Sequence, residues 1–208
     1  WAAESDYIAI SPGVAMSDVQ APTNKLIGDV EIFAQAIQPR RAKLIAITGA
    51  NGKTTVTTLC GEMCKEAGLE TVVAGNIGLP VLDALSDIEQ GKRAMPEVFV
   101  LELSSFQLET LTALNADAAT VLNLTQDHMD RYSGMEDYAA AKRRIFSGAG
   151  VQIINRDDDY SRSMALPQRT ISTFGLEAPA NDSEWGMVHA EGQAWLAHGW
   201  KKLIPIAE

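Results

Sequence analysis

A glycine-rich turn between an apolar segment and a helix-like segment constrains this chain more than any other feature of its sequence. Residues 44–47 are apolar and rich in β-branched side chains, which predicts a buried strand, and residues 56–67 carry apolar side chains at helical spacing. The turn between them reads Thr48-Gly49-Ala50-Asn51-Gly52-Lys53-Thr54-Thr55. Glycines let the backbone approach an anion, and the free N–H groups at the start of a helix point at it. The three parts together predict a phosphate-binding site.

Two side chains of this turn suit the phosphates of a nucleotide and a magnesium ion. Lys53 is placed to reach the terminal phosphates, and the Thr54 hydroxyl is placed to bind the Mg²⁺ that bridges them. The predicted cofactor-binding residues are Gly49, Ala50, Asn51, Gly52, Lys53, Thr54 and Thr55. The alternative is an ordinary glycine-rich turn, which the flanking elements disfavour. The turn is shorter than the general P-loop, because only two residues separate its glycines.

Apolar and helix-like segments alternate along the rest of the chain. This order predicts an α/β fold with a mainly parallel sheet that is covered by helices on both faces. The expected strands are 71–74, 98–103, 118–124 and 151–155, and the expected helices are 28–37, 81–85, 104–109 and 135–146. From Ser161 onward, shorter strands at 170–174 and 195–206 predict a small antiparallel appendage to the same domain.

The order of the strands also predicts where the functional residues meet. Ligands of parallel α/β sheets bind outside the carboxyl ends of the strands. The residues at or just after such ends are Gly49, Asn76, Glu102 and His128. We therefore expect these four residues to converge on one crevice.

Composition narrows the kinds of partner and the compartment. The net charge of −10 argues against a general nucleic-acid surface, although a local loop can still bind a nucleotide. No apolar segment approaches membrane-spanning length, which argues against a membrane protein. Cys60 and Cys64 lack further ligands for a zinc set, so we expect buried free thiols and a reducing cytoplasm.

The first residues predict the end of a preceding domain. Tyr7 to Ile10 are an apolar run before a Ser-Pro-Gly turn, which is typical of a last strand and its turn. The chain begins with Trp rather than Met, so we expect a fragment of a longer protein. We assign residues 1–27 to the end of an N-terminal domain and 28–208 to an incomplete nucleotide-binding domain.

Three further side chains are candidates for chemistry at the crevice. Glu102 ends an otherwise apolar strand, which indicates a magnesium ligand; the alternative is a capped or solvated residue that leaves the sheet. His128 lies between two aspartates, either as a second metal ligand or substrate contact, or as a loop histidine held by those carboxylates. Lys142 lies beside two arginines, and the pattern alone predicts a solvated basic face.

The sequence of the turn resembles the loop of the Mur ligase superfamily, whose members are ATP-dependent enzymes that form amide bonds. Four stretches carry the resemblance, namely 48–55, 75–80, 101–109 and 127–132 with Lys142 following. The Ser-Ser-Phe-Gln-Leu-Glu stretch at 104–109 is the most specific and points to the branch that adds D-glutamate. The similarity runs from about Tyr7 to about Asp159 and then weakens.

The resemblance implies ATP and two Mg²⁺ ions. Lys53 and the loop backbone would bind the ATP phosphates, and Thr54 and Glu102 would hold one ion. His128 and a carbamylated Lys142 would hold the second ion, because carbamylation turns the cation into an anionic oxygen ligand. Lys53, His128 and Lys142 are then the expected catalytic residues.

The resemblance also implies the substrate and its contacts. Asn76, Ser104 and Gln107 would contact the muramoyl substrate, Ser11 would lie near its uridine diphosphate end, and Arg131 is a further candidate. The implied reaction adds D-glutamate to UDP-N-acetylmuramoyl-L-alanine through an acyl phosphate, in cytoplasmic peptidoglycan synthesis. A monomer is expected, and a C-terminal domain with most of the D-glutamate pocket would be absent, so we expect the chain alone to be inactive.

Three other functions remain open from the sequence. A sister ligase for another amino acid, or a folylpolyglutamate-type ligase, would use the same loop and His128, although 104–109 argues against both. A nucleotide-dependent switch that binds a partner protein would hydrolyse ATP slowly and ignore UDP-sugars. A degenerate structural domain is disfavoured by the intact Lys53, Thr54 and Glu102.

Overall fold

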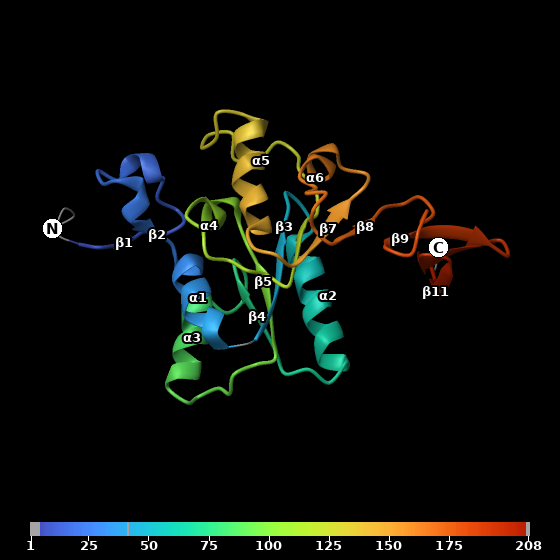
Figure 1. Ribbon diagram of the computed structural model, residues 1–208, viewed down its shortest axis with the longest axis horizontal. Helices are drawn as coiled ribbons and strands as arrows, with labels where there is room; N and C mark the ends of the chain where they lie inside the picture. The colour runs from blue at the N-terminus through green and yellow to red at the C-terminus, as the bar shows by residue number, and fades with distance from the viewer. Residues whose placement is uncertain (1–4, 41, 207–208) are drawn as a thin grey trace.

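The described part of the chain, residues 5–40 and 42–206 of a computed structural model, is built around one nine-stranded sheet (Figure 1). The order of its strands is β11-β10-β9-β8-β7-β6-β3-β5-β4. The strands are β3 (Lys43–Thr48), β4 (Thr71–Gly75), β5 (Val98–Glu102), β6 (Ala118–Val121), β7 (Val151–Asn155), β8 (Ile171–Phe174), β9 (Glu184–Ala190), β10 (Gln193–His198) and β11 (Lys201–Pro205). All neighbours from β4 to β9 pair in parallel, which confirms the expected α/β fold.

The antiparallel appendage is smaller and begins later than the sequence predicted. The strand expected at 170–174 is β8, which pairs in parallel with β7 and so belongs to the main sheet. The appendage is β9, β10 and β11, which pair antiparallel and project from the body of the protein (Figure 1). The segment 195–206 is two strands, because Gly199 turns the chain with a φ of 52°.

Helices cover both faces of the sheet, as expected. The α-helices are α1 (Asp29–Ile37), α2 (Lys53–Glu66), α3 (Val81–Glu89), α4 (Ser105–Glu109), α5 (Met135–Arg143) and α6 (Asp159–Ser163). Short 3₁₀ turns occur at Met16–Asp18, Thr23–Lys25, Gln38–Arg40 and Arg144–Phe146. Figure 1 shows α1 and α3 on one side of the sheet and α2 on the other.

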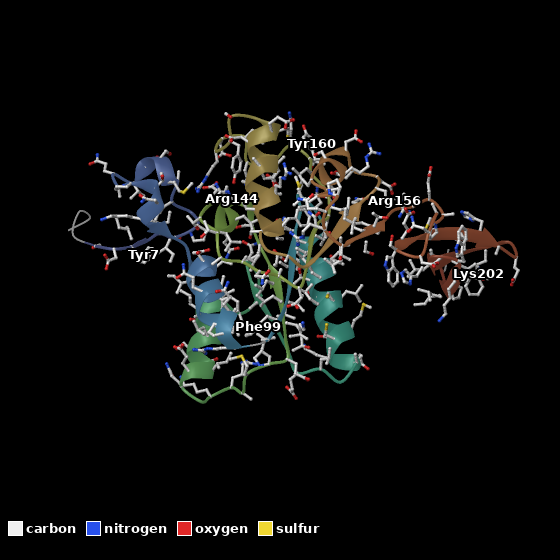
Figure 2. All side chains as sticks on the ribbon, in the orientation of Figure 1. Tyr7, Phe99, Arg144, Arg156, Tyr160 and Lys202 are labelled. Carbon is white, nitrogen blue, oxygen red and sulfur yellow. The ribbon has the colours of Figure 1, made fainter. Side chains whose placement is uncertain are left out.

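The larger hydrophobic core lies between the sheet and the helices α1 and α3. Phe33 of α1 is completely buried and packs edge-on against Phe99 of β5, with ring centroids 5.1 Å apart and ring planes at 80°. Figure 2 shows Phe99 beside α1. Such aromatic pairs stabilise a core beyond the area that they bury. This packing fixes β5, whose last residue is Glu102.

Helix α2 packs on the opposite face through its smallest residue. A Cβ added at Gly61 would lie 2.3 Å from Cγ2 of Val73, so the helix approaches β4 more closely than a larger residue allows. The apolar side chains of Leu59 and Met63, which share one helical side with Ala67, are 58% and 64% exposed. The apolar side that the sequence predicted for this helix therefore faces away from the sheet.

The two cysteines of α2 are free and only half-buried, which corrects the expectation of fully buried thiols. Burial and the neighbouring Cys64 raise the pKa of the Cys60 thiol to about 11. Cys60 therefore stays protonated near neutral pH, and the thiolate needed for metal binding is disfavoured.

The N-terminal segment forms a separate small sheet. Strand β1 (Ile8–Ala9) pairs in parallel with β2 (Leu26–Ile27), and neither strand joins the main sheet. The strand at Leu26–Ile27 was not expected from the sequence. Residues 1–4 of the proposed N-terminal portion, and residues 41 and 207–208 of the proposed second domain, lie outside the described residues. Within the described ranges, no helix has the length and apolar character needed to cross a membrane.

The close approach at Gly61 can be tested by substitution. Gly61→Val is expected to lower the free energy of unfolding by about 1–3 kcal/mol, because the added methyl groups overpack the contact with Val73. Urea unfolding followed by circular dichroism measures the change. Thr58→Val places the same side chain at an exposed position of α2 and is expected to stay within about 0.5 kcal/mol of the parent. Equal stability of the two variants would contradict the close packing.

Candidate active site at the carboxyl edge of the sheet

The glycine-rich turn joins the end of β3 to the start of α2. Its backbone is held by Asn123, which follows β6: the Ala50 N–H donates to the Asn123 carbonyl, and the Asn51 N–H donates to Asn123 Oδ1, both over 2.9 Å. The Asn123 side-chain amide also donates to the Asn51 carbonyl over 3.1 Å. Asn123 therefore fixes the shape of the loop. The sequence analysis missed this residue, because only strand order brings β6 beside β3.

The loop fits a phosphate group. Gly52 caps α2 with a φ of 78°, and no other heavy atom lies within 4 Å of a Cβ built there, so an anion can approach the backbone. Lys53 Nζ donates to the carbonyls of Gly49 and Ala50, each over 2.9 Å, which keeps its ammonium group inside the loop. The first N–H groups of α2 have no partner within the helix and remain as donors.

Glu102 is the buried acceptor where three elements meet. Glu102 is only 1% exposed. Its two carboxylate oxygens accept hydrogen bonds from Thr54 Oγ1 and Asn76 Nδ2, both over 2.9 Å. The Asn76 N–H donates to the Glu102 carbonyl over 2.8 Å. A Cβ at Gly75 would lie 2.2 Å from that carbonyl oxygen, so only glycine allows this approach. The solvated alternative for Glu102 is wrong.

Thr54 and Glu102 together fit a magnesium ion. A hydroxyl and a carboxylate side by side are the hard oxygen ligands that Mg²⁺ takes. Among the described residues, no group of three or more His, Cys, Asp or Glu side chains surrounds a point where a metal could bind. Magnesium commonly fits such a small protein donor set, because phosphates and waters complete its coordination.

Lys142 points into the protein, so the solvated basic face predicted by the pattern alone is wrong. The residue is 1% exposed, whereas its neighbours Arg143 and Arg144 are exposed. Lys142 Nζ donates to Thr48 Oγ1 over 3.1 Å and to the Gly49 carbonyl over 3.0 Å. Burial, and next the positive charge of Lys53, lower the pKa of Lys142 to about 7. A substantial share of its amine is therefore neutral at physiological pH.

His128 approaches the same edge from the loop after β6. Its backbone is left-handed, with a φ of 55°, and its side chain is 43% exposed. Its Nε2 lies 3.5 Å from Asp127 Oδ2. Its ring centroid lies 6.5 Å from that of Tyr138, and Lys142 Nζ lies 4.9 Å from the centre of the same Tyr138 ring. His128 and Lys142 are thus gathered around Tyr138, which the sequence analysis did not single out.

Four of the predicted substrate residues occupy three places. Ser104 caps α4 by accepting from the Gln107 N–H over 3.2 Å, and Gln107 also donates to Asp29 over 3.2 Å. Asn76 belongs to the Glu102 cluster. Ser11 lies apart, in an exposed turn of the N-terminal segment that the Val14 N–H closes over 2.9 Å. The loop residues, Asn76 and Glu102 thus converge as expected, whereas Ser11 lies on a separate element.

Arg131 has a partner that the sequence analysis did not anticipate. Its guanidinium group donates to both carboxylate oxygens of Glu109, over 3.1 and 2.6 Å, and to the Val14 carbonyl over 3.2 Å. Hydrogen bonding with Glu109 raises the pKa of Arg131. Glu109 ends the 104–109 stretch that the sequence analysis singled out, but its pairing with Arg131 depends on the tertiary fold.

Comparisons with known proteins agree with this geometry. Residues 47–202 match the family model described as the Mur ligase middle domain. The UDP-N-acetylmuramoylalanine--D-glutamate ligase of Methylobacillus flagellatus is 55% identical over 210 residues, covering 99% of this chain and 45% of that protein. The ligase of the same name from Thiobacillus denitrificans is 50% identical, covering 99% of this chain and 46% of its own length. The chain thus spans about half the length of these curated relatives.

Solved structures show the same fold at low sequence identity. The MurF ligase of Thermotoga maritima, in complex with ADP, matches with a TM-score of 0.61 and 18% identity, over 92% of this chain and 46% of that one. Fold and loop geometry define an α/β domain with a glycine-rich loop at the carboxyl edge of a parallel sheet. Within that class, the chain belongs to the Mur ligase family, whose middle domain it contains.

The buried Lys142 predicts a specific pH dependence of stability. A lysine whose pKa is about 7 when folded, against 10.5 for the ordinary side chain, destabilises the folded state fully below pH 7 and not above about pH 10.5. Lys142→Met is therefore expected to raise the free energy of unfolding most at pH 6–7, with the gain shrinking as the pH rises. Denaturation in bicarbonate-free buffer between pH 6 and 9.5 measures it.

A surface lysine provides the matched control. Lys65→Met removes an exposed lysine of α2 that pairs with Glu62, and its effect is expected to stay within about 0.5 kcal/mol across the same pH range. A gain from Lys142→Met that does not change with pH would mean that the folded protein does not lower the pKa of this amine.

Proposed function

We propose that the full-length protein containing this chain is an ATP-dependent ligase that adds D-glutamate to UDP-N-acetylmuramoyl-L-alanine and forms ADP. The observation that carries the proposal is the contact of Thr54 with Glu102 beside the Lys53 loop, which would place a magnesium ion next to bound phosphates. The names of the relatives at 50–55% identity support the choice of amino acid. We also propose a cytoplasmic, monomeric enzyme of peptidoglycan synthesis.

ATP and two Mg²⁺ ions are the proposed partners of the crevice. Lys53 and the loop N–H groups would bind the phosphates, with Gly49, Ala50, Asn51, Gly52, Thr54 and Thr55 as the remaining loop residues. Thr54 and Glu102 would hold one ion, and His128 and Lys142 the other. Bound magnesium supplies positive charge that screens the phosphates from an incoming carboxylate.

The reaction requires two anions to meet. Attack by the substrate carboxylate on the γ-phosphate of ATP forms an acyl phosphate and releases ADP. The amine of D-glutamate then attacks the acyl carbon, loses a proton and expels phosphate. The ammonium group of Lys53 offsets the repulsion in the first step, and the fixed loop N–H groups stabilise the charge on the transferring group.

We propose the muramoyl substrate contacts on the same basis. Ser104 and Gln107 lie beside one another at the start of α4, and Asn76 adjoins Glu102. Each of these polar groups now bonds within the protein, so a substrate would have to exchange with those partners. Ser11 would lie near the uridine diphosphate end. We assign residues 1–27 to the N-terminal domain and 28–208 to the central domain, and we expect the chain alone not to complete the reaction.

The environment of Lys142 supports its proposed carbamylation, which is testable. A neutral amine attacks CO₂ to form a carbamate and releases one proton, and a pKa near 7 supplies the neutral form. In ¹³C-bicarbonate, the full-length protein is expected to show one slowly exchanging carbamate carbon signal that grows as the pH rises from 6 to 8. The signal should be absent from Lys142→Arg. An unmodified lysine under all these conditions would contradict the proposal.

Phosphate release tests the proposed function directly. With Mg-ATP, the full-length protein is expected to release phosphate only when both UDP-N-acetylmuramoyl-L-alanine and D-glutamate are present. Lys53→Met should reduce kcat by about 10²-fold or more, because it removes the charge that offsets anion repulsion. Release driven by another amino acid would indicate a sister ligase. Slow release indifferent to both substrates would indicate a nucleotide-dependent switch.

A further inference from the structure

Arg131 joins three parts of the protein that are far apart in the sequence. Its guanidinium group forms the two hydrogen bonds to Glu109 and the one to the Val14 carbonyl described above, and its Cζ lies 4.4 Å from the centre of the Phe106 ring. The Arg131 and Glu109 side chains are each only 12% exposed. A paired, half-enclosed arginine of this kind is rigid, because its planar group is fixed by both carboxylate oxygens.

The ring that Arg131 contacts also contacts His128. The Phe106 and His128 ring centroids lie 4.7 Å apart, with ring planes at 52°. Phe106 belongs to α4, so the position of the His128 ring depends on a side chain that Arg131 covers. A contact through one aromatic ring therefore links the Arg131–Glu109 pair to His128.

The backbone of His128 is held by the same pair. A φ of 55° is sparsely populated for a residue with a side chain, and it persists only where the surroundings fix it. The Arg131 and Tyr132 N–H groups donate to the His128 carbonyl over 2.9 and 3.3 Å. The Tyr132 hydroxyl donates to Glu109 over 2.7 Å. Glu109 thus anchors both residues that close the turn at His128.

A role for Arg131 as a substrate contact is less compatible with these bonds. A guanidinium group that is paired with a carboxylate has little net charge to offer a phosphate or carboxylate of a substrate. Releasing Arg131 to such a ligand would leave Glu109 partly enclosed without its cation, which is costly. The observed bonds instead serve the shape of the His128 loop.

We propose that Arg131 and Glu109 are positioning residues that hold His128 in its working orientation and tie the N-terminal segment, through the Val14 carbonyl, to the same loop. This inference rests on the proposed function, in which His128 holds a magnesium ion. It assigns Arg131 a role different from the substrate contact suggested by the sequence.

Steady-state kinetics of the full-length protein separate the two roles. Arg131→Gln is expected to lower kcat by about 10–100-fold, since a small misplacement of a functional group has effects of this size. The KM for UDP-N-acetylmuramoyl-L-alanine should change less than about threefold. Arg131→Lys should restore only part of kcat, because lysine cannot bond both carboxylate oxygens. A large rise in KM with kcat unchanged would overturn the proposal in favour of a substrate contact.

Hydrogen exchange tests the positioning role without relying on activity. In Arg131→Gln and in Glu109→Gln, the backbone amides of residues 127–132 are expected to exchange at least tenfold faster than in the parent protein, because the turn at His128 loses its anchor. If these amides exchange in both variants at the same rate as in the parent protein, the proposal is overturned. If the parent protein lacks D-glutamate-dependent turnover, the proposed function fails, and the exchange data still decide whether Arg131 and Glu109 fix this loop.

A second half-buried ion pair provides the matched control. Arg156 lies 3.4 Å from Glu184, with side chains 21% and 16% exposed, near β7 and β9 (Figure 2). Arg156→Gln removes a comparable pair whose further partners, Thr173 and the Glu177 carbonyl, lie outside the 127–132 loop, and it is expected to leave kcat and the exchange of residues 127–132 unchanged. Equal effects of Arg156→Gln and Arg131→Gln on kcat and on the loop would mean general destabilisation and would overturn the proposal.

Discussion

The rest of the site depends on the hydrogen bonds of the buried Glu102 carboxylate. A carboxylate that is 1% exposed needs partners for both oxygens, and it takes them from Thr54 on α2 and Asn76 after β4. These bonds join the start of α2 to the ends of β5 and of β4, the strand at the edge of the sheet. The glycine at 75 is required for the same reason, since any side chain there would collide with the Glu102 carbonyl. Satisfying one buried acid therefore ties the start of α2, where the glycine-rich loop ends, to the ends of β4 and β5.

A second constraint comes from the buried Lys142, which hydrogen-bonds to that loop. Lys142 lies where its ammonium group is desolvated and faces the charge of Lys53, so its pKa falls toward neutrality. Its hydrogen bonds to Thr48 and the Gly49 carbonyl tie α5 to the loop. The hydrogen bonds of Asn123 tie the end of β6 to the loop. The loop is thus supported by elements that lie far from it in the sequence.

Much of the fold and of the geometry of the glycine-rich loop could be predicted because the signals are local. A strand, a glycine-rich turn and a helix with Lys53 and Thr54 are contiguous, and strand ends in a parallel sheet must share one edge. The predictions that failed concern which side of a helix faces the sheet and which side chains pair with one another. Leu59 and Met63 follow helical spacing, yet α2 meets the sheet through Gly61, because only a residue without a side chain allows that distance. Arg131 gave no local sign that it would pair with Glu109.

By itself, the sequence determined the class of fold, the position of the glycine-rich loop and the gathering of Gly49, Asn76 and Glu102 at one edge, because these follow from periodicity and strand order. Only the tertiary structure decided that Lys142 is buried while Arg143 and Arg144 are exposed, since adjacent positions of a helix point in different directions and the packing of α5 selects which one turns inward. Only the tertiary structure joined β8 to the parallel sheet, because the partner of a short strand is set by contacts distant in the sequence.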